Sequence, residues 1–185
     1  MMASIFQMRV LFWVACAAFT LPLPAMAGSK AFTTYGNIFQ AALPVAAAAL
    51  TSARDDGEGL KQFAYSGLAT LGTTYALKYA IDSKRPNGGS HSFPSGHTSS
   101  AFWGASYIHE RYGWQLGFPA EILAAAVAGS RVDAKAHHWR DVIASALIAD
   151  TSAYFLVTPH DSGVLLTPWS NGPKGSFGIA GKVHF

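Results

Sequence analysis

The chain of 185 residues is half apolar and only 12% of its residues are charged. This length suffices for one domain with its own core, and the charged fraction is well below the quarter typical of soluble proteins. The net charge of +3 is small and the basic residues do not form a stripe, which argues against nucleic acid as a partner. The apolar excess therefore indicates buried helices or contact with a membrane.

The N-terminal segment 1–27 has the pattern of a secretory signal peptide. A basic residue precedes an apolar run, and a proline-containing stretch then leads to an Ala-x-Ala site before Gly28. An uncleaved transmembrane helix is the alternative, and the short apolar run with its prolines disfavours it. We therefore expect an exported, periplasmic protein. The only cysteine, Cys16, lies in this segment, so the mature chain is expected to lack disulfides and thiolate chemistry.

Beyond the signal segment the pattern predicts an all-α fold, a bundle of about five core helices. The third helix is expected to begin at Ser95 as its N-cap, and Pro119 suits the first turn of the fourth. The predicted helices span residues 37–53, 60–82, 95–111, 118–130 and 138–157.

The chain thus divides into the signal segment, a helical domain at 28–158 and a Gly- and Pro-rich tail at 159–185. The Asn171-Gly172 pair in the tail would suit a small hairpin, but Pro168 and Pro173 fit strands badly. We therefore expect an irregular tail. The predicted helices are short or interrupted by charges, which favours a soluble or peripheral bundle over one that spans the membrane several times.

Three polar blocks carry the chemistry. The first, residues 78–86, reads Lys, six residues, then Arg-Pro. The second, 93–100, contains Pro-Ser-Gly-His. The third, 130–141, reads Ser-Arg, five residues, His, three residues, then Asp.

The cations of these blocks suit a tetrahedral dianion. Lys78 and Arg85 are seven residues apart, so on a helix they share one face, and Arg131 would come from another helix. Arginine offers bidentate geometry and lysine a point charge. Ser95 and Gly96 would open a helix whose free N–H groups form an anion site.

The histidines add a nucleophile and an acid. His137 and Asp141 are spaced i and i+4, so a carboxylate could fix one imidazole nitrogen and leave the other free to attack phosphorus. His97 could protonate the leaving oxygen and later deprotonate water. His138 lies three residues from Asp141 and could reach the same carboxylate. A zinc site from His91, His97 and His137 or His138 is the alternative, which the surrounding cations disfavour.

Together the blocks resemble the phosphatidic acid phosphatase type 2 superfamily, whose pattern is K-x6-RP, PSGH and SR-x5-H-x3-D. All eleven fixed positions are present at the family spacing within residues 78–141. The resemblance implies a helical, metal-independent phosphatase without a cofactor. It also implies a phosphohistidine at His137, paired with Asp141, and selects His137 over His138.

The remaining roles follow from the same resemblance. It implies His97 as general acid and phosphate contacts from Lys78, Arg85, Ser95, Gly96 and Arg131. The expected substrate is a phosphate monoester, either a small molecule or a lipid phosphate or pyrophosphate, and association with a membrane stays open. The alternatives are a vanadate-dependent haloperoxidase, disfavoured because those enzymes are generally much larger, and a helical bundle that binds phosphate without catalysis.

Overall fold

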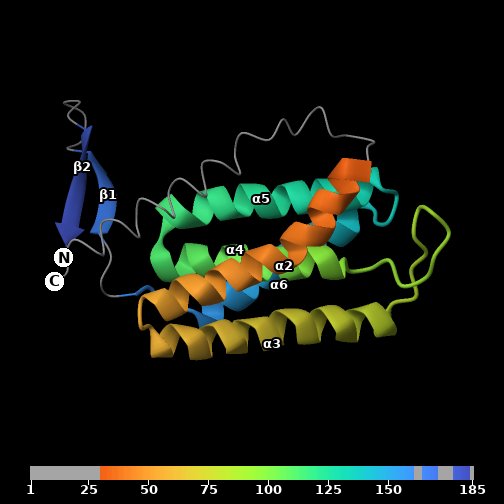
Figure 1. Ribbon diagram of the computed structural model, residues 1–185, viewed down its shortest axis with the longest axis horizontal. Coiled ribbons are helices and arrows are strands. Elements are labelled where there is room, and N and C mark those ends of the chain that lie inside the picture. The colour runs from red at the N-terminus through yellow and green to blue at the C-terminus, as the bar shows by residue number, and fades with distance from the viewer. Residues whose placement is uncertain (1–29, 161–163, 171–176, 184–185) are drawn as a thin grey trace.

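The computed structural model describes residues 30–160, 164–170 and 177–183, and the predicted signal segment lies outside them. Over these residues the chain forms a bundle of helices followed by a β-hairpin (Figure 1). The elements are α2 (Lys30–Ala53), α3 (Gly57–Ala80), α4 (Gly96–Tyr112), α5 (Trp114–Asp133), α6 (Trp139–Leu156), β1 (Val164–Ser170) and β2 (Phe177–Val183). The predicted helical bundle is confirmed.

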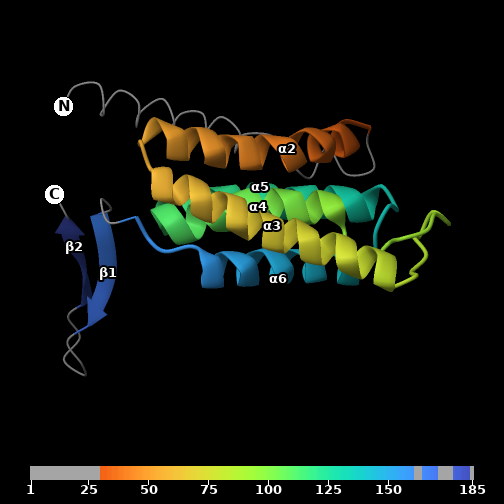
Figure 2. The same ribbon diagram turned by 90° about the horizontal axis from the view of Figure 1, so that it is seen from below.

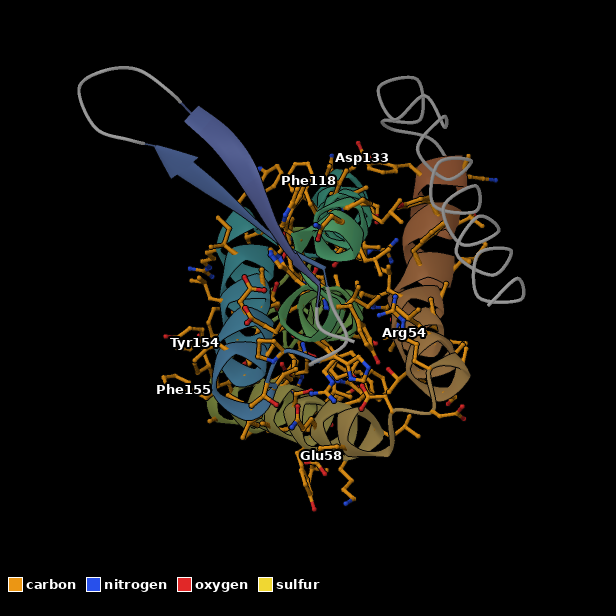
Figure 3. All side chains as sticks on the ribbon, turned by 90° about the vertical axis from the view of Figure 1, so that its left-hand side faces the viewer. Arg54, Glu58, Phe118, Asp133, Tyr154 and Phe155 are labelled. Carbon is orange, nitrogen blue, oxygen red and sulfur yellow. The ribbon has the colours of Figure 1, made fainter. Side chains whose placement is uncertain are left out.

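Helix α4 forms the centre of the bundle. Viewed along the bundle axis, α2, α3, α5 and α6 surround it, while Tyr154 and Phe155 of α6 and Glu58 of α3 point outward (Figure 3). Ala101, Ala105 and Tyr107 of α4 are fully buried. The core therefore forms around α4, whose small residues let four helices pack against it, and it includes apolar side chains of α2, α5 and α6.

Small side chains let the helices approach closely. A Cβ on Gly104 of α4 would lie 2.5 Å from the backbone nitrogen of Pro44 and 2.6 Å from the carbonyl carbon of Leu43, both in α2. A Cβ on Gly117 of α5 would overlap the backbone of His109 in α4. Glycine is thus required where these helix pairs cross.

Two helices are longer than the sequence predicts. Helix α2 begins at Lys30 instead of residue 37, because Phe32 and Tyr35 bury their rings in the core and hold a segment of modest helix propensity. Helix α5 begins at Trp114 instead of residue 118. Gly113, with φ of 83°, reverses the chain in one residue, so the next helix starts at once.

The expected irregular tail is wrong for residues 164–170 and 177–183. Strands β1 and β2 pair antiparallel, from Val164 opposite Val183 to Ser170 opposite Phe177. The two prolines were the reason to expect irregular structure. However, Pro168 lies on a two-stranded sheet, where one edge of each strand needs no backbone donor, so its missing N–H is tolerated.

Consecutive helices run in opposite directions, so their termini alternate between the two ends of the bundle. Figures 1 and 2 show the ends of α3 and α5 and the starts of α2, α4 and α6 at one end, and the hairpin at the other. None of the helices in the described residues is long and apolar enough to cross a membrane. The end where five helix termini meet contains the polar blocks of the sequence.

Candidate active site

The loop between α3 and α4 supplies the first part of the site. It is anchored to α3 through the Lys78 ammonium, which donates to the carbonyls of His91 (3.0 Å) and Pro94 (2.5 Å). Within the loop, Arg85 Nε donates to the Ser90 carbonyl at 3.1 Å. The backbone N–H of Asn87 donates to the Lys135 carbonyl, which ties the loop to the α5–α6 connection. Loop carbonyls therefore accept from both cations of the first block. Because α3 ends at Ala80, Arg85 lies in the loop and does not share a helix face with Lys78, as their spacing suggested.

Helix α4 begins in the site as predicted. Ser95 is its N-cap and its hydroxyl accepts from the N–H of Thr98. Ser145 of α6 fixes this cap, because its hydroxyl accepts from the Ser95 N–H at 2.8 Å and contacts the Ser95 carbonyl. A side chain on Gly96 would meet no atom within 4 Å, so space is open beside the first turn. His97 follows, partly buried.

Arg131 comes from the last turn of α5 and is only 4% exposed. All three of its guanidinium nitrogens donate within the protein: Nε to Ser130, Nη1 to Asn37 and Nη2 to the Thr33 carbonyl. The last two partners belong to α2, outside the sequence blocks.

His137 lies in the connection between α5 and α6, and its side chain is only 4% exposed. Its i, i+4 spacing to Asp141 suggested that both residues lie on the last helix, but α6 begins two residues after His137, at Trp139. Its Nδ1 lies 2.8 Å from the Ser92 carbonyl and 3.7 Å from Asp141 Oδ2. Because a carbonyl can only accept, Nδ1 carries the proton and Nε2 keeps its lone pair. Ser92, rather than Asp141, makes the hydrogen bond that sets the tautomer.

Asp141 is fully buried beside His137 and also stabilises the start of α6. Its Oδ2 accepts from the Ser92 hydroxyl at 2.5 Å and from the His138 N–H at 2.9 Å. Burial by itself would raise its pKa, but these hydrogen bonds outweigh it and lower the pKa of Asp141. The group is therefore a carboxylate at neutral pH. His138, at 3.4 Å from the same oxygen, is 42% exposed.

The electrostatics show that the blocks converge. Burial and the neighbouring cations, chiefly Arg131, lower the pKa of His97 to about 4. Burial, together with Arg85 and Lys78, lowers the pKa of His137 to about 4, although the Ser92 carbonyl opposes the shift. Burial and Arg85 also lower the pKa of Lys78. Without a bound anion the cations repel one another and both histidines are neutral at pH 7, so the site is suited to an anion.

Metal ligands do not gather in this arrangement. Across the described part of the chain, no three His, Cys, Asp or Glu side chains lie close enough to hold a metal ion. The zinc alternative from three histidines thus has no ligand set here.

The structure brings all eight predicted site residues to one end of the bundle, while their chemical roles stay predictions. It adds three residues that the motif did not indicate: Ser92, Ser145 and Asn37, which hold His137 and Asp141, the α4 cap and Arg131 respectively. Ser92 lies two residues before the Pro-Ser-Gly-His block, and that proximity was its only signal. Asn37 had none, since α2 reaches Arg131 only through the fold.

Comparison with known proteins gives two matches. A sequence model of the PAP2 superfamily matches residues 25–161. Among solved structures, LpxE from Aquifex aeolicus superposes with a TM-score of 0.61 at 18% sequence identity, covering 81% of this chain and 93% of that one. At this identity the likeness concerns the fold alone. No curated protein matches the sequence.

Proposed function

The chain belongs to the PAP2 superfamily and is a phosphatase, and on this premise we propose that it hydrolyses phosphate monoesters through a phosphohistidine on His137. The observation that carries the proposal is the hydrogen bond from His137 Nδ1 to the Ser92 carbonyl at 2.8 Å. It leaves Nε2 as a neutral, unprotonated nitrogen beside Lys78 and Arg85, which is what nucleophilic attack on a phosphate dianion requires.

In the first step Nε2 of His137 forms a bond to phosphorus while the bond between phosphorus and the ester oxygen breaks. His97 gives its proton to the leaving oxygen. The free ring has a pKa of about 4, but a dianion held between the cations offsets their charge and raises that pKa toward neutrality. In the second step His97 takes a proton from water, whose oxygen attacks phosphorus and releases His137 and inorganic phosphate.

The cations stabilise the charge that develops on the three equatorial oxygens in both steps. Lys78 and Arg85 lie on the α3 side and Arg131 on the α5 side of His97, and all three contribute to its pKa shift. The N–H groups of the first turn of α4, beside the open space at Gly96, would bind the remaining oxygen.

For the substrate class we favour a lipid phosphate over a sugar phosphate. An apolar groove of about 390 Å³ runs along α3 and α4. Phe63, Leu68 and Trp103 line it, and Tyr75 brings it within one helical turn of Lys78. An acyl chain would bury its methylene groups against this surface, whereas the many hydroxyls of a sugar would lose hydrogen bonds to water there. We further propose that residues 1–27 direct the chain to the periplasm, which N-terminal sequencing of the exported protein would test.

The test of the reaction uses purified protein in EDTA with p-nitrophenyl phosphate and a short-chain phosphatidate. We expect phosphate release from both, inhibition by vanadate and preference for the lipid. His137→Ala should lose activity and the acid-labile phosphate label transferred from the substrate, whereas the matched control His138→Ala, at a neighbour whose side chain is 42% exposed, should keep both. Equal phosphate release by His137→Ala and the parent protein would contradict the mechanism.

A further inference from the structure

Helix α2 accepts two hydrogen bonds from Arg131 of the site, and this contact has the features of a positioning device. The guanidinium lies against the first turns of α2, where Nη1 donates to Asn37 Oδ1 and Nη2 to the Thr33 carbonyl, each at 2.7 Å. Thr33 and Asn37 are four residues apart, so both acceptors lie on one face of the helix, one turn from each other. Their spacing matches the two-pronged end of the arginine.

Gly36 makes room for this contact. A Cβ at position 36 would overlap both the Ser130 hydroxyl and the Arg131 guanidinium. Ser130 completes the arrangement, because its hydroxyl accepts from Arg131 Nε at 3.0 Å and donates to the Val127 carbonyl at 2.7 Å. Four residues thus determine where a long and otherwise flexible side chain lies.

The remaining hydrogens of the Arg131 guanidinium are free to bind an anion in the site. Arginine has five N–H donors, and three nitrogens each use one in these bonds, so one hydrogen on Nη1 and one on Nη2 remain for an anion. Both acceptors from α2, the Asn37 side chain and the Thr33 carbonyl, are uncharged amide oxygens and not carboxylates. They therefore orient Arg131 without neutralising the charge that lowers the pKa of His97.

We propose that Asn37, with Gly36 beside it, is a positioning residue for phosphate binding that acts through Arg131. The inference rests on the proposed function in one respect, namely that Arg131 contacts the phosphate group. It assigns a role in the site to α2, which lies outside the three sequence blocks. Without the Asn37 acceptor the guanidinium keeps its charge but loses one of the bonds that set its direction.

The test is a double-mutant cycle of Asn37→Ala and Arg131→Ala, with Thr34→Ala as matched control. Thr34 is an exposed residue of the same helix turn whose hydroxyl bonds only to the Lys30 carbonyl of α2. Two experiments are made: steady-state kinetics give kcat and KM for p-nitrophenyl phosphate, and calorimetry gives the Kd of inorganic phosphate. The second needs no turnover, so it tests the inference even if the wild-type protein releases no phosphate.

We expect Asn37→Ala to raise KM and the phosphate Kd about tenfold, the size of one hydrogen bond to a charged group. Thr34→Ala should change neither quantity. In the Arg131→Ala background, Asn37→Ala should have no further effect, because the side chain through which it acts is gone. If Asn37 had a purely structural role, Asn37→Ala would lower the melting temperature and leave the phosphate Kd unchanged.

Two results would overturn the inference: an unchanged phosphate Kd in Asn37→Ala, or an equal loss with and without Arg131. Gly36→Ala provides a second approach through steric displacement of the guanidinium, and it should also weaken phosphate binding. Its matched control is Gly57→Ala in the first turn of α3, at the opposite end of the bundle, where a Cβ would meet no atom within 4 Å and phosphate binding should not change.

Discussion

Ser92 links His137, the proposed nucleophile, to the buried carboxylate of Asp141. Its carbonyl accepts from His137 Nδ1 and its hydroxyl donates to Asp141 Oδ2. The backbone half of this link survives any substitution, whereas the hydroxyl half does not. The two functions of the residue can therefore be separated by experiment.

Ser92→Ala should lower the free energy of unfolding by about 1.5–3 kcal/mol, since Asp141 is fully buried and loses a charge-assisted hydrogen bond. kcat should fall as well, because the carboxylate beside His137 is less firmly held. Urea unfolding and steady-state kinetics measure the two effects. Ser90→Ala, at an exposed position in the same loop, should change neither quantity. A Ser92→Ala protein as stable as the parent would contradict this account.

The lowered pKa values of His97 and His137 make stability depend on pH. Both groups have a pKa of about 4 in the folded protein, against 6.5 for an ordinary histidine. Between these values the unfolded chain binds protons that the folded chain does not, so stability falls as the pH falls through this window. The raised pKa of Asp150, caused by burial, acts in the opposite direction.

A variant comparison isolates one histidine from the other titrating groups. From pH 7 to pH 5, His97→Gln should lose roughly 1–2 kcal/mol less of its unfolding free energy than the parent protein, because it lacks one of the groups that protonate on unfolding. Urea titrations at the two pH values measure the difference. Equal pH dependence in both proteins would show that the His97 pKa is not lowered in the folded state.

For single residues, the sequence predicted the motif residues better than the residues that hold them in place. All eight motif residues were indicated because their types and spacing follow from the reaction. Ser145 and Asn37 act through a hydroxyl and an amide that many surface positions carry equally well, so only the fold distinguishes them. The pairing of His137 also differed, because a carbonyl, which every residue has, took the place expected for Asp141.

At the scale of the elements, α2 and α4 cross closely at Gly104. The atoms that a Cβ would meet there are backbone atoms of Leu43 and Pro44, which cannot rotate away as a side chain could. Helix α2 would have to shift as a whole.

Gly104→Ala should therefore destabilise the fold by about 1–3 kcal/mol, even though alanine is the better helix former. Gly72→Ala should instead stabilise it by about 0.5–1 kcal/mol, because a Cβ there meets nothing and only the helix propensity changes. Urea unfolding of both variants measures the contrast. If Gly104→Ala stabilised the protein as Gly72→Ala does, the close crossing would be refuted.

The helices themselves were largely predictable, because alanine-rich stretches, caps and prolines mark them locally. Two of the boundaries missed were set by tertiary structure. The first turns of α2 form because Phe32 and Tyr35 are buried, and α5 starts early because α4 is beside it to pack on. The hairpin was not expected for a different reason. Prolines argue against strands in general, but a two-stranded sheet has an unpaired edge on each strand, where a proline is tolerated.

At the scale of the whole molecule, the end opposite the site has its own buried ionic centre. Arg111 donates to both carboxylate oxygens of Asp56, at 2.6 and 2.8 Å, and the side chains are only 6% and 3% exposed. Arg111 also donates to the Thr158 carbonyl, so it holds the segment after α6 against the α2–α3 corner. The candidate site and the buried ion pair are thus at opposite ends of the bundle.

Arg111→Ala should lower the unfolding free energy by about 3–5 kcal/mol, because it leaves a buried carboxylate without its partner. Lys61→Ala removes an exposed ion pair with Glu58 and should cost less than about 1 kcal/mol. For protein that remains folded, kcat/KM should be the same in both variants as in the parent. A loss of kcat/KM in folded Arg111→Ala would show that the two ends are coupled.

The position of the hairpin has a practical consequence for handling the protein. Strand β2 ends at Val183, at the end of the bundle remote from the candidate site (Figure 1). A fluorophore, affinity tag or sensor surface attached C-terminal to this strand would leave the candidate site facing away from the point of attachment. Immobilised enzyme should accordingly keep access to its substrates, including substrates presented in vesicles or micelles too large to diffuse beneath a tethered molecule.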